Sequence, residues 1–348
     1  MLCLGIESSC DETAIALVRD GVFVDALLAS QTDIHALFGG VVPELASREH
    51  YRLIGPLYDH LMVRNQLLAS DLDVVAVARG PGLLGSLLVG VAFAKALALA
   101  AGARFIGVNH LHAHLMAVVL HANIPWPALG LLVSGGHTEI YLMEGPARFT
   151  RLGRTLDDAA GEAFDKIAKF LGLPYPGGVI LDSLAQRGQA DPKLFPRPYL
   201  NNDTLDFSFS GLKTSVMSFL KKERPVWNAE EDLNSAPKEL CNLCASINLA
   251  VVETLCAKLV RALDGMPHLH TLVLAGGVAA NSLLRIHCQE LMRERQGFLL
   301  APPLELCTDN GVMIAYAGAL LAKQDLSHRL DMESIARGRS IPDDLCVV

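Results

Sequence analysis

Hydrophobic residues alternate with short polar turns along the first thirty residues of the chain. Apolar runs at residues 2–7, 13–19 and 22–29 have the length of strands, and Asp20-Gly21 between the last two is a hairpin signal. Amphipathic or apolar segments at 43–63, 83–101 and 110–121 predict helices, and strand-like runs at 73–78 and 104–108 separate them. The pattern therefore predicts the order β-β-β-α-β-α-β-α.

The same order of elements is expected again after residue 128. Strands are predicted at 128–134, 138–143, 148–152, 271–275 and 298–300, and helices at 156–171, 278–295 and 309–322. A Pro/Gly-rich and polar stretch with long helical patterns interrupts this repeat at about 174–265. We predict an α/β fold of duplicated lobes of the actin, Hsp70 and sugar-kinase type, with a central cleft and a helical insertion in the second lobe. The first lobe is expected to span 1–106 plus about 310–348, and the second 107–309.

Length and charge narrow the class of protein. The chain has 348 residues, of which 51% are hydrophobic, so two cores are expected. Its formal net charge of -8 opposes non-specific adhesion to nucleic acid, so any contact with RNA needs a local basic patch or a helper protein. The candidate basic residues are Lys221, Lys222 and Arg224, or Arg285, Arg293 and Arg295.

Cysteine usage and the N-terminal pattern indicate the compartment. Eight cysteines without regular spacing predict reduced thiols and a cytoplasmic protein. Cys241 and Cys244 are interpreted as core packing, because no second pair completes a zinc site. The start of the chain has no signal-peptide pattern, and the apolar segment 83–101 is expected to be a buried helix because strands flank it. No membrane association is expected.

Two unusual turns occupy the same topological place in the two halves, between the first and second strands. They are residues 7–13 (ESSCDET) and residues 134–138 (SGGHT). Small residues let backbone N–H groups approach an anion, so these turns could hold a nucleotide phosphate, although Gly-Gly also forms ordinary turns. Adjacent carboxylates beside such a site would bind a cation, take a proton or orient a nucleophile. We assign Asp11 as a base and Glu12 as its support; a solvated turn is the alternative.

Histidines at helical spacing suggest a metal site. His110 and His114 lie four residues apart at the start of a predicted helix, about 6 Å apart along its axis, so both rings can reach one ion. His112 points to another side. Asp309, where a loop enters the last helix, is a third candidate ligand, with a helix cap as the alternative. Two histidines on a helix also occur without metal, but with a carboxylate they suit iron(II) or zinc.

Three further segments carry weaker signals. Residues 275–281 (AGGVAAN) link a strand to a helix, where glycines allow an adenosine to lie against the backbone. Asp157 and Asp158 are expected in the first turn of the helix at 156–171, which suits the helix dipole. Asp165 lies deeper in that helix and could bind a ligand hydroxyl or pair with Lys169.

Taken together, these motifs resemble the TsaD family of tRNA threonylcarbamoyltransferases, formerly described as O-sialoglycoprotein endopeptidases, over nearly the whole chain. The matching segments are residues 5–13 (GIESSCDET), 43–48 (PELASR), 79–82 (RGPG), 133–138 (VSGGHT), 207–213 (FSFSGLK) and 276–281 (GGVAAN). The resemblance implies transfer of the threonylcarbamoyl group from threonylcarbamoyl-adenylate to N6 of adenosine 37 in tRNAs that read codons beginning with A. The products would be N6-threonylcarbamoyladenosine and AMP.

The resemblance also implies roles for single residues. It makes His110, His114 and Asp309 the ligands of one divalent metal per subunit, iron(II) or zinc. It assigns the adenylate to the turn formed by Val133, Ser134, Gly135, Gly136 and His137. It places Asp165, Gly178 and Asn281 in the ligand site and implies a ribose contact for Asp182. Asp11 and Glu12 match positions assigned to catalysis. His112 stands where members of the family usually carry Glu or another residue.

The implied partners are tRNA, a TsaB-like paralogue, a TsaE-like ATPase and a separate synthase that makes the adenylate. Three other functions agree less well with the sequence. A metalloprotease would place Glu beside a ligand histidine, where Leu111 stands. A carbohydrate kinase or ATPase would depend on magnesium rather than on paired histidines. A scaffold subunit would be expected to lose the candidate ligands and the acidic pair.

Overall fold

The computed structural model describes residues 1–38, 40–120, 122–200, 202–223, 233–342 and 344–347. The chain forms two compact units, Met1–Asn123 with Thr308–Val348, and Ile124–Cys307. The lobe boundary expected near residue 106 falls inside strand β5 (Arg104–Asn109), and the first unit continues through helix α4 (His110–Met116). It does so because α4 packs against α10 (Gly311–Ala322) of the same unit.

The first unit contains a five-stranded sheet in the order β3-β2-β1-β4-β5. Its other strands are β1 (Leu2–Glu7), β2 (Glu12–Arg19), β3 (Val22–Ser30) and β4 (Val74–Gly80). β1 pairs antiparallel with β2, and β2 with β3, whereas β4 and β5 run parallel to β1. Asp20 and Gly21 both have positive φ in the turn between β2 and β3, as a tight hairpin requires.

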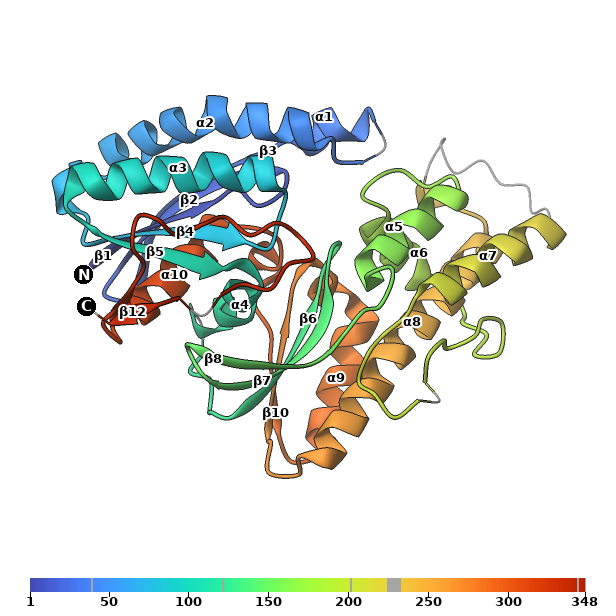
Figure 1. The fold of residues 1–348 in the computed structure, drawn as a ribbon. Coiled ribbons are helices and arrows are strands. Elements are labelled where there is room, and N and C mark those ends of the chain that lie inside the picture. The colour runs from blue at the N-terminus through green and yellow to red at the C-terminus, as the bar shows by residue number, and fades with distance from the viewer. Residues whose placement is uncertain (39, 121, 201, 224–232, 343, 348) are drawn as a thin grey trace. The chain divides into compact units, whose positions relative to one another are not determined.

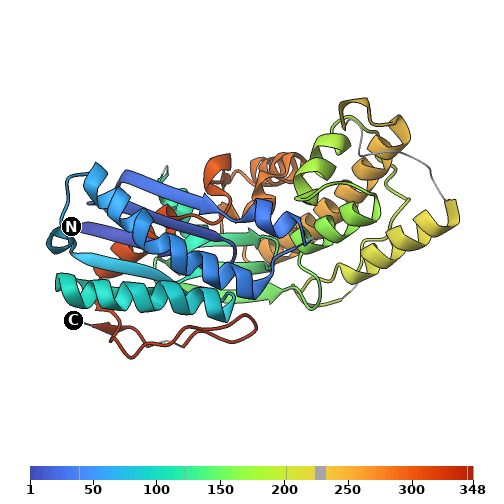
Figure 2. The ribbon, with the colours of Figure 1, turned by 90° about the horizontal axis from the view of Figure 1, so that it is seen from above.

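Helices cover both faces of this sheet. α2 (Pro43–Arg64) and α3 (Leu84–Ala101) pack side by side over the strands (Figures 1 and 2), and α10 packs against β1, β2 and β4 from the other side. A side chain on Gly5 of β1 would overlap the backbone of Ala315, so glycine permits this close approach. A short helix that the sequence pattern did not predict, α1 (Thr32–Ala36), precedes α2.

After α10, residues 326–342 and 344–347, here named the C-terminal strap, return along β4 and β5. The backbone N–H groups of His328, Ile335 and Arg337 donate to the carbonyls of Phe105, Arg79 and Gly82. The strap begins and ends in the paired strands β11 (Leu326–Ser327) and β12 (Cys346–Val347).

Arg79 holds the C-terminal strap through a buried charge. Its guanidinium, 1% exposed, donates to both carboxylate oxygens of Asp344 and to the carbonyl of Glu333, and lies 3.0 Å from Nε2 of His328. A buried cation requires such partners, since removal from water is otherwise very unfavourable. Arg79 therefore fixes the strap to the end of β4.

The second unit repeats the topology of the first, with the sheet order β10-β9-β6-β7-β8. Its strands are β6 (Ala128–Val133), β7 (Thr138–Gly145), β8 (Arg148–Arg154), β9 (Thr271–Ala275) and β10 (Phe298–Leu300). β6, β7 and β8 are antiparallel, β9 is parallel to β6, and β10 is parallel to β9. The predicted duplicated α/β fold is confirmed.

The helices of the second unit include the predicted insertion. They are α5 (Ala160–Phe170), α6 (Gly177–Ala185), α7 (Ser210–Glu223), α8 (Lys238–Gly265) and α9 (Ser282–Glu294), with a short 3-10 helix, η4 (Gly277–Ala280), before α9. The apolar core includes Phe164, Phe207, Phe209 and most of the apolar residues of α8. Cys241 and Cys244 are unpaired and buried in this core, as expected.

Helix α5 begins later than predicted, and this changes the interpretation of two acids. Asp157 and Asp158 lie before the helix rather than in its first turn, so that expectation was wrong. Asp157 accepts hydrogen bonds from the backbone and side chain of Ser210 and from Ser208 and Phe209. Asp158 pairs with Lys166 and Lys213. The two acids fasten the start of α7.

Two helices, α3 and α8, are long and apolar enough to cross a membrane by length and composition alone. Core helices of globular proteins pass the same test, and 72% of the apolar window of α8 is buried within the protein. α3 packs against β4 and α2.

Candidate functional site

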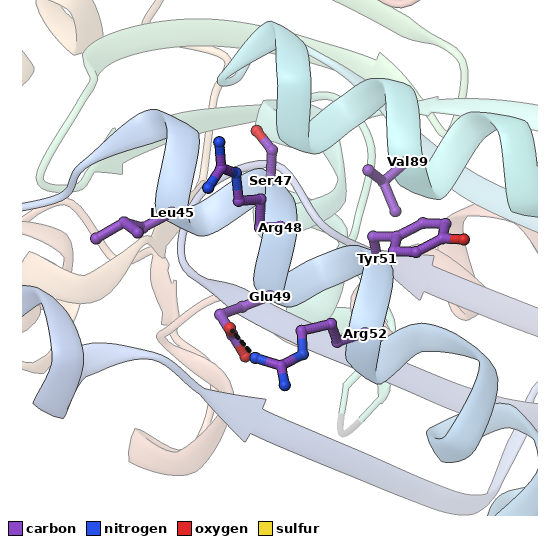
Figure 3. A pocket seen from close by; sticks show the side chains of 7 residues that line it. All are labelled: Leu45, Ser47, Arg48, Glu49, Tyr51, Arg52 and Val89. Carbon is purple, nitrogen blue, oxygen red and sulfur yellow. Dashed lines mark hydrogen bonds and ion pairs between the residues drawn. The ribbon is translucent and has the colours of Figure 1, made fainter.

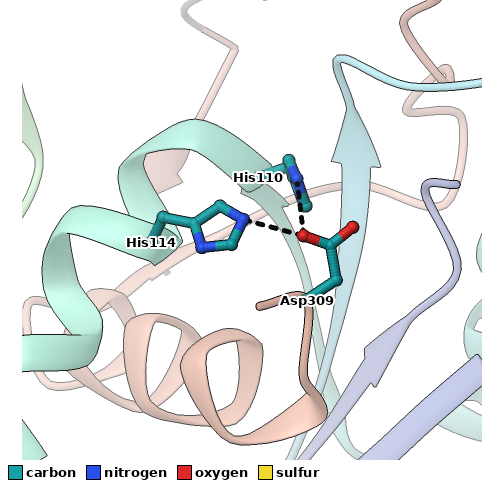
Figure 4. A group of neighbouring side chains, drawn as sticks. All are labelled: His110, His114 and Asp309. Atoms are coloured by element: carbon teal, nitrogen blue, oxygen red, sulfur yellow. Dashed lines mark hydrogen bonds and ion pairs between the residues drawn. The ribbon is translucent and has the colours of Figure 1, made fainter. Parts of the chain in front are cut away.

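Helix α4 places both candidate histidine ligands on one buried face. It begins directly after β5, where the side chain of Asn109 accepts hydrogen bonds from the backbone N–H groups of Leu111 and His112 and so caps the helix. His110 and His114 follow one turn apart, and Figure 4 shows both rings pointing toward Asp309, which lies just before α10.

The three side chains form a set of metal donors. Oδ1 of Asp309 lies 2.9 Å from Nε2 of His114 and 3.6 Å from Nε2 of His110, and the three potential ligand atoms all lie within 4.8 Å of one another. Asn310 caps α10, so Asp309 does not act as the cap. Two imidazole nitrogens and a carboxylate oxygen at this separation can converge on one divalent ion.

Glu7 contacts His110 at Nδ1, the ring nitrogen opposite the one that faces Asp309. This carboxylate, fully buried at the end of β1, accepts a hydrogen bond from Ser9 N through Oε1 at 2.6 Å and lies 3.0 Å from Nδ1 of His110 through Oε2. Burial alone would lower the pKa of His110, but the charges of Glu7 and Asp309 outweigh it and raise that pKa to about 9. A carboxylate on the far nitrogen is the usual way in which a ligand histidine is oriented.

Nδ1 of His114 and the ring of His112 lie near this group of three side chains. Nδ1 of His114 is buried without a hydrogen-bond partner among the described residues. The ring is held through Nε2, which lies 2.9 Å from Asp309. His112 lies 3.2 Å from the amide of Asn109, and burial lowers its pKa to about 4. Within the described part of the chain, the group of potential ligands contains His110, His114 and Asp309, without His112.

The acidic pair lies in the turn after β1. Asp11 is buried and Glu12 is half-buried, so the turn is not a solvated one. Burial, the charges of Asp309 and Asp11, and a hydrogen bond to Asp11 raise the pKa of Glu12 to about 9. His50 of α2 fixes the turn, with Nδ1 2.8 Å from the hydroxyl of Thr13 and Nε2 2.9 Å from the carbonyl of Cys10. Glu12 therefore holds its proton more readily than an ordinary glutamate does.

The second turn, residues 133–137, lies in the second unit. The hydroxyl oxygen of Ser134 accepts hydrogen bonds from the backbone N–H groups of Gly136 and His137, and Ser134 N donates to His137 O. Gly161 of α5 and Gly276, which has a φ of 89°, lie against this turn. A Cβ on Gly161 would lie 2.6 Å from Ser134 O, and one on Gly276 would overlap Val133 O. Glycine at both positions lets these elements support the turn.

The remaining predicted binding residues form two pairs in the second unit. Gly178 N donates to Asp165 Oδ1 at 3.1 Å, and burial raises the pKa of Asp165. Gly178, rather than Lys169, is thus the partner found for Asp165. Asp182 and Asn281 are both bonded to Asn248, a residue of α8 that the sequence pattern did not single out.

The structure therefore gathers the predicted residues into two groups, one in each unit. Asp11, Glu12, His110, His114 and Asp309 belong to the first unit, together with Glu7, which was not predicted. The turn at 133–137 belongs to the second unit with Asp165, Gly178, Asp182 and Asn281. A shallow pocket of about 640 Å³ on the first unit contains none of them (Figure 3). Its lining residues are Leu45, Ser47, Arg48, Glu49, Tyr51, Arg52 and Val89.

Three of the candidate basic residues have partners within the protein. Arg285 donates to the carbonyls of Ala279 and Pro302, Arg295 pairs with Asp264, and Lys222 pairs with Glu223. Arg224 lies outside the described residues.

The sequence is similar to known proteins along nearly the whole chain. The family model TsaD, tRNA N6-adenosine threonylcarbamoyltransferase, matches residues 23–316. A protein of that name from Desulfovibrio desulfuricans is 62% identical over 99% of this chain and 96% of its own length. Another from Lawsonia intracellularis is 57% identical over the whole of both chains.

Solved structures support the fold at much lower identity. HypF from T. kodakarensis gives a TM-score of 0.61 at 16% identity, covering 93% of this chain and 48% of that one. An activator of 2-hydroxyisocaproyl-CoA dehydratase from Clostridium difficile gives 0.52 at 14% identity, covering 93% and 96%. These likenesses concern architecture alone. The match to the family model and the near full-length relatives show that this chain belongs to the TsaD family of tRNA N6-adenosine threonylcarbamoyltransferases.

Proposed function

We propose that this chain transfers the threonylcarbamoyl group from threonylcarbamoyl-adenylate to N6 of adenosine 37 in tRNAs that read codons beginning with A. The products are N6-threonylcarbamoyladenosine and AMP. The observation that carries the proposal is the 62% identity, over 99% of the chain, to a relative named for this transferase activity. The His110, His114 and Asp309 cluster supports it over a kinase, which would need phosphate-bound magnesium instead.

The proposed reaction is an acyl transfer. N6 of the adenosine attacks the carbamoyl carbon, the bond from that carbon to the phosphate oxygen of AMP breaks, and N6 loses a proton. In this proposal Asp11 takes the proton, and Glu12, whose pKa is raised, would orient the Asp11 carboxylate through the hydrogen bond between them.

His110, His114 and Asp309 would hold one divalent ion, iron(II) or zinc. Such an ion supplies Lewis-acid chemistry, which polarises a carbonyl or an anionic leaving group. Glu7 would fix the tautomer of His110 through Nδ1, so that Nε2 offers its lone pair to the ion.

Binding of the adenylate is assigned to the second unit. The turn of Val133, Ser134, Gly135, Gly136 and His137 would hold the adenylate, since glycine-rich turns hold anions in other proteins. Asp165, Gly178, Asp182 and Asn281 would contact the adenosine part of the adenylate, with Asp182 at the ribose.

The partners belong to the same proposal. They are tRNA, a TsaB-like paralogue, a TsaE-like ATPase and the synthase that supplies the adenylate. The net charge of -8 supports a helper that contributes part of the RNA-binding surface. A cytoplasmic location agrees with eight unpaired cysteines.

The test is tRNA modification in vitro with the purified chain, the partner proteins, the synthase, threonine, bicarbonate and ATP. Nucleoside mass spectrometry would compare the wild type with His110→Ala and Asp11→Ala, and His112→Ala is the control on the same helix. We expect product from the wild type and the control, and a loss of at least about a hundredfold in the other two variants. A folded wild type that makes no product would refute the proposed activity.

A further inference from the structure

We propose that Asn248 is a positioning residue for the adenylate site, because its side chain joins Asp182 to Asn281. The inference rests on the proposed function, in which these two residues contact the adenosine part of the adenylate. Asn248 would act through them rather than by touching the substrate.

The geometry shows a polar bridge between three helices. Asn248 lies in the middle of α8 and is 2% exposed. Its Nδ2 donates to Oδ1 of Asp182 on α6 at 3.0 Å, and its Oδ1 accepts from Nδ2 of Asn281 at 2.8 Å, where α9 begins. Ser246 and Thr254, two other polar side chains buried on α8, donate to backbone carbonyls of α8 itself. The two hydrogen bonds of the Asn248 amide instead reach other elements.

The chemistry of the partners fixes the direction of this bridge. An ionised carboxylate only accepts hydrogen bonds, so the amide of Asn248 must turn its N–H₂ group toward Asp182. Its oxygen then faces Asn281, which must donate in return. This sets the Asn281 amide with its own oxygen toward Leu284 N, where it caps α9 at 3.0 Å. One side chain thus bonds to both proposed binding residues and sets the direction of both hydrogen bonds.

The rest of the network holds Asp182 from the other side. Ser282 donates to Asp182 from both its backbone N–H and its hydroxyl, and Gln186 donates to Oδ2. Asp182 is the charged member of this set, and its other partners are neutral. Removing the Asn248 side chain would leave Asp182 Oδ1 with Ser282 alone and would take away the acceptor of the Asn281 N–H₂ group.

Two substitutions separate positioning from packing. Asn248→Leu keeps the shape but removes both hydrogen bonds. Asn248→Asp keeps the shape and the acceptor but sets a second carboxylate against Asp182. A proton taken up by this pair restores a donor between them, so Asn248→Asp should recover as the pH falls, whereas Asn248→Leu should not. Asn242→Asp is the matched control, since the hydrogen bond found for the Asn242 side chain of α8 among the described residues is accepted by its oxygen, from Gln189 N.

The experiment measures the KM for threonylcarbamoyl-adenylate and kcat in the complete tRNA modification reaction from pH 6 to pH 8.5, relative to the wild type at each pH. At pH 8.5 we expect KM to rise about tenfold or more in both Asn248 variants, with a smaller change in kcat, because hydrogen bonds to a charged group are lost. At pH 6 the KM of Asn248→Asp should return toward the wild type. Asn242→Asp should follow the wild type throughout.

Circular dichroism of each variant distinguishes the outcomes. The inference is overturned if an active wild type is matched by both Asn248 variants at every pH. It is equally overturned if activity is lost in step with folded protein and does not recover on acidification, since Asn248 would then be a core residue only. An inactive wild type would instead count against the proposed function.

Discussion

Replacing Glu7 by Gln should change the number of protons that the His110, His114 and Asp309 group releases when it binds a metal. The pKa of His110 in the metal-free protein is about 9, since Glu7 and Asp309 overcome the effect of burial. At pH 7.5 the ring is therefore roughly 97% protonated. A metal binds only the neutral ring, so binding should displace about one proton from His110.

The Gln variant keeps the shape of the side chain but loses its charge. Burial, the largest influence on His110, then opposes the imidazolium with only Asp309 to offset it, so the pKa should return to its ordinary value of 6.5 or below. At pH 7.5 the ring would be at most about 10% protonated, and the proton release should fall by about 0.9.

The same shift has a consequence for the metal-free fold. A pKa raised from 6.5 to about 9 stabilises the protein fully below pH 6.5, and this stabilisation disappears as the pH rises through 9. The shift corresponds to roughly 3 kcal/mol. Glu7→Gln should remove most of that pH dependence.

The assay is calorimetric titration of the metal-free protein with zinc at pH 7.5, in two buffers that differ in ionisation enthalpy. The difference in measured heat gives the number of protons released per ion. His112→Ala is the control, since burial keeps His112 neutral at this pH and its loss should leave the count unchanged. Equal proton release from Glu7→Gln and the wild type, at one zinc per chain, would refute the assigned role of Glu7.

Three further predictions follow from the same contacts. Asp309→Asn should bind zinc at least about tenfold more weakly, measured by competition with a chelator, and unchanged affinity would remove Asp309 from the ligand set. Glu12→Gln should raise the melting temperature of the metal-free protein at pH 8 but not at pH 5. The raised pKa of Glu12 makes the folded protein less stable as the pH climbs from 4.5 toward 9, and Gln removes this effect. Equal shifts in melting temperature at both pH values would contradict this explanation. Gly276→Ala should reduce the free energy of unfolding by about 1 kcal/mol or more and raise the KM for the adenylate, because the new Cβ overlaps Val133 O at a positive φ. Gly265→Ala, which meets no atom within 4 Å, is its control, and similar losses in both would contradict the steric explanation.

Local patterns explain why so much of the fold could be predicted from the sequence. Alternating apolar residues specify the three-stranded starts of both sheets, and the Asp20-Gly21 turn is a property of two adjacent residues. The start of α5 could not be predicted in this way. Asp157 and Asp158 are good first-turn residues, but their partners lie some fifty residues ahead in the 207–213 segment. Distant contacts overrode the local preference.

The residues of the candidate site likewise divide into those that local patterns predict and those whose roles come from distant contacts. His110 and His114 could be paired by helix geometry alone, and Asp309 by its place at the entrance to a helix. Glu7 and Asn248 could not be found, because the role of each comes from neighbours on other elements. A weak signal existed for Asn248, an amide within a mostly apolar stretch of a long helix. Its two partners are 66 and 33 residues away.

The division of the chain has a consequence for its synthesis on the ribosome. The first unit is made of two separate segments of the sequence, whereas the second unit is continuous. The second unit can therefore fold while the first still lacks α10 and Asp344, the carboxylate that pairs with Arg79. Asp309 is translated about two hundred residues after the histidines that it approaches. During translation, His110 and His114 therefore leave the ribosome before their carboxylate partner exists, and the candidate ligand set is complete only after Asp309 has emerged.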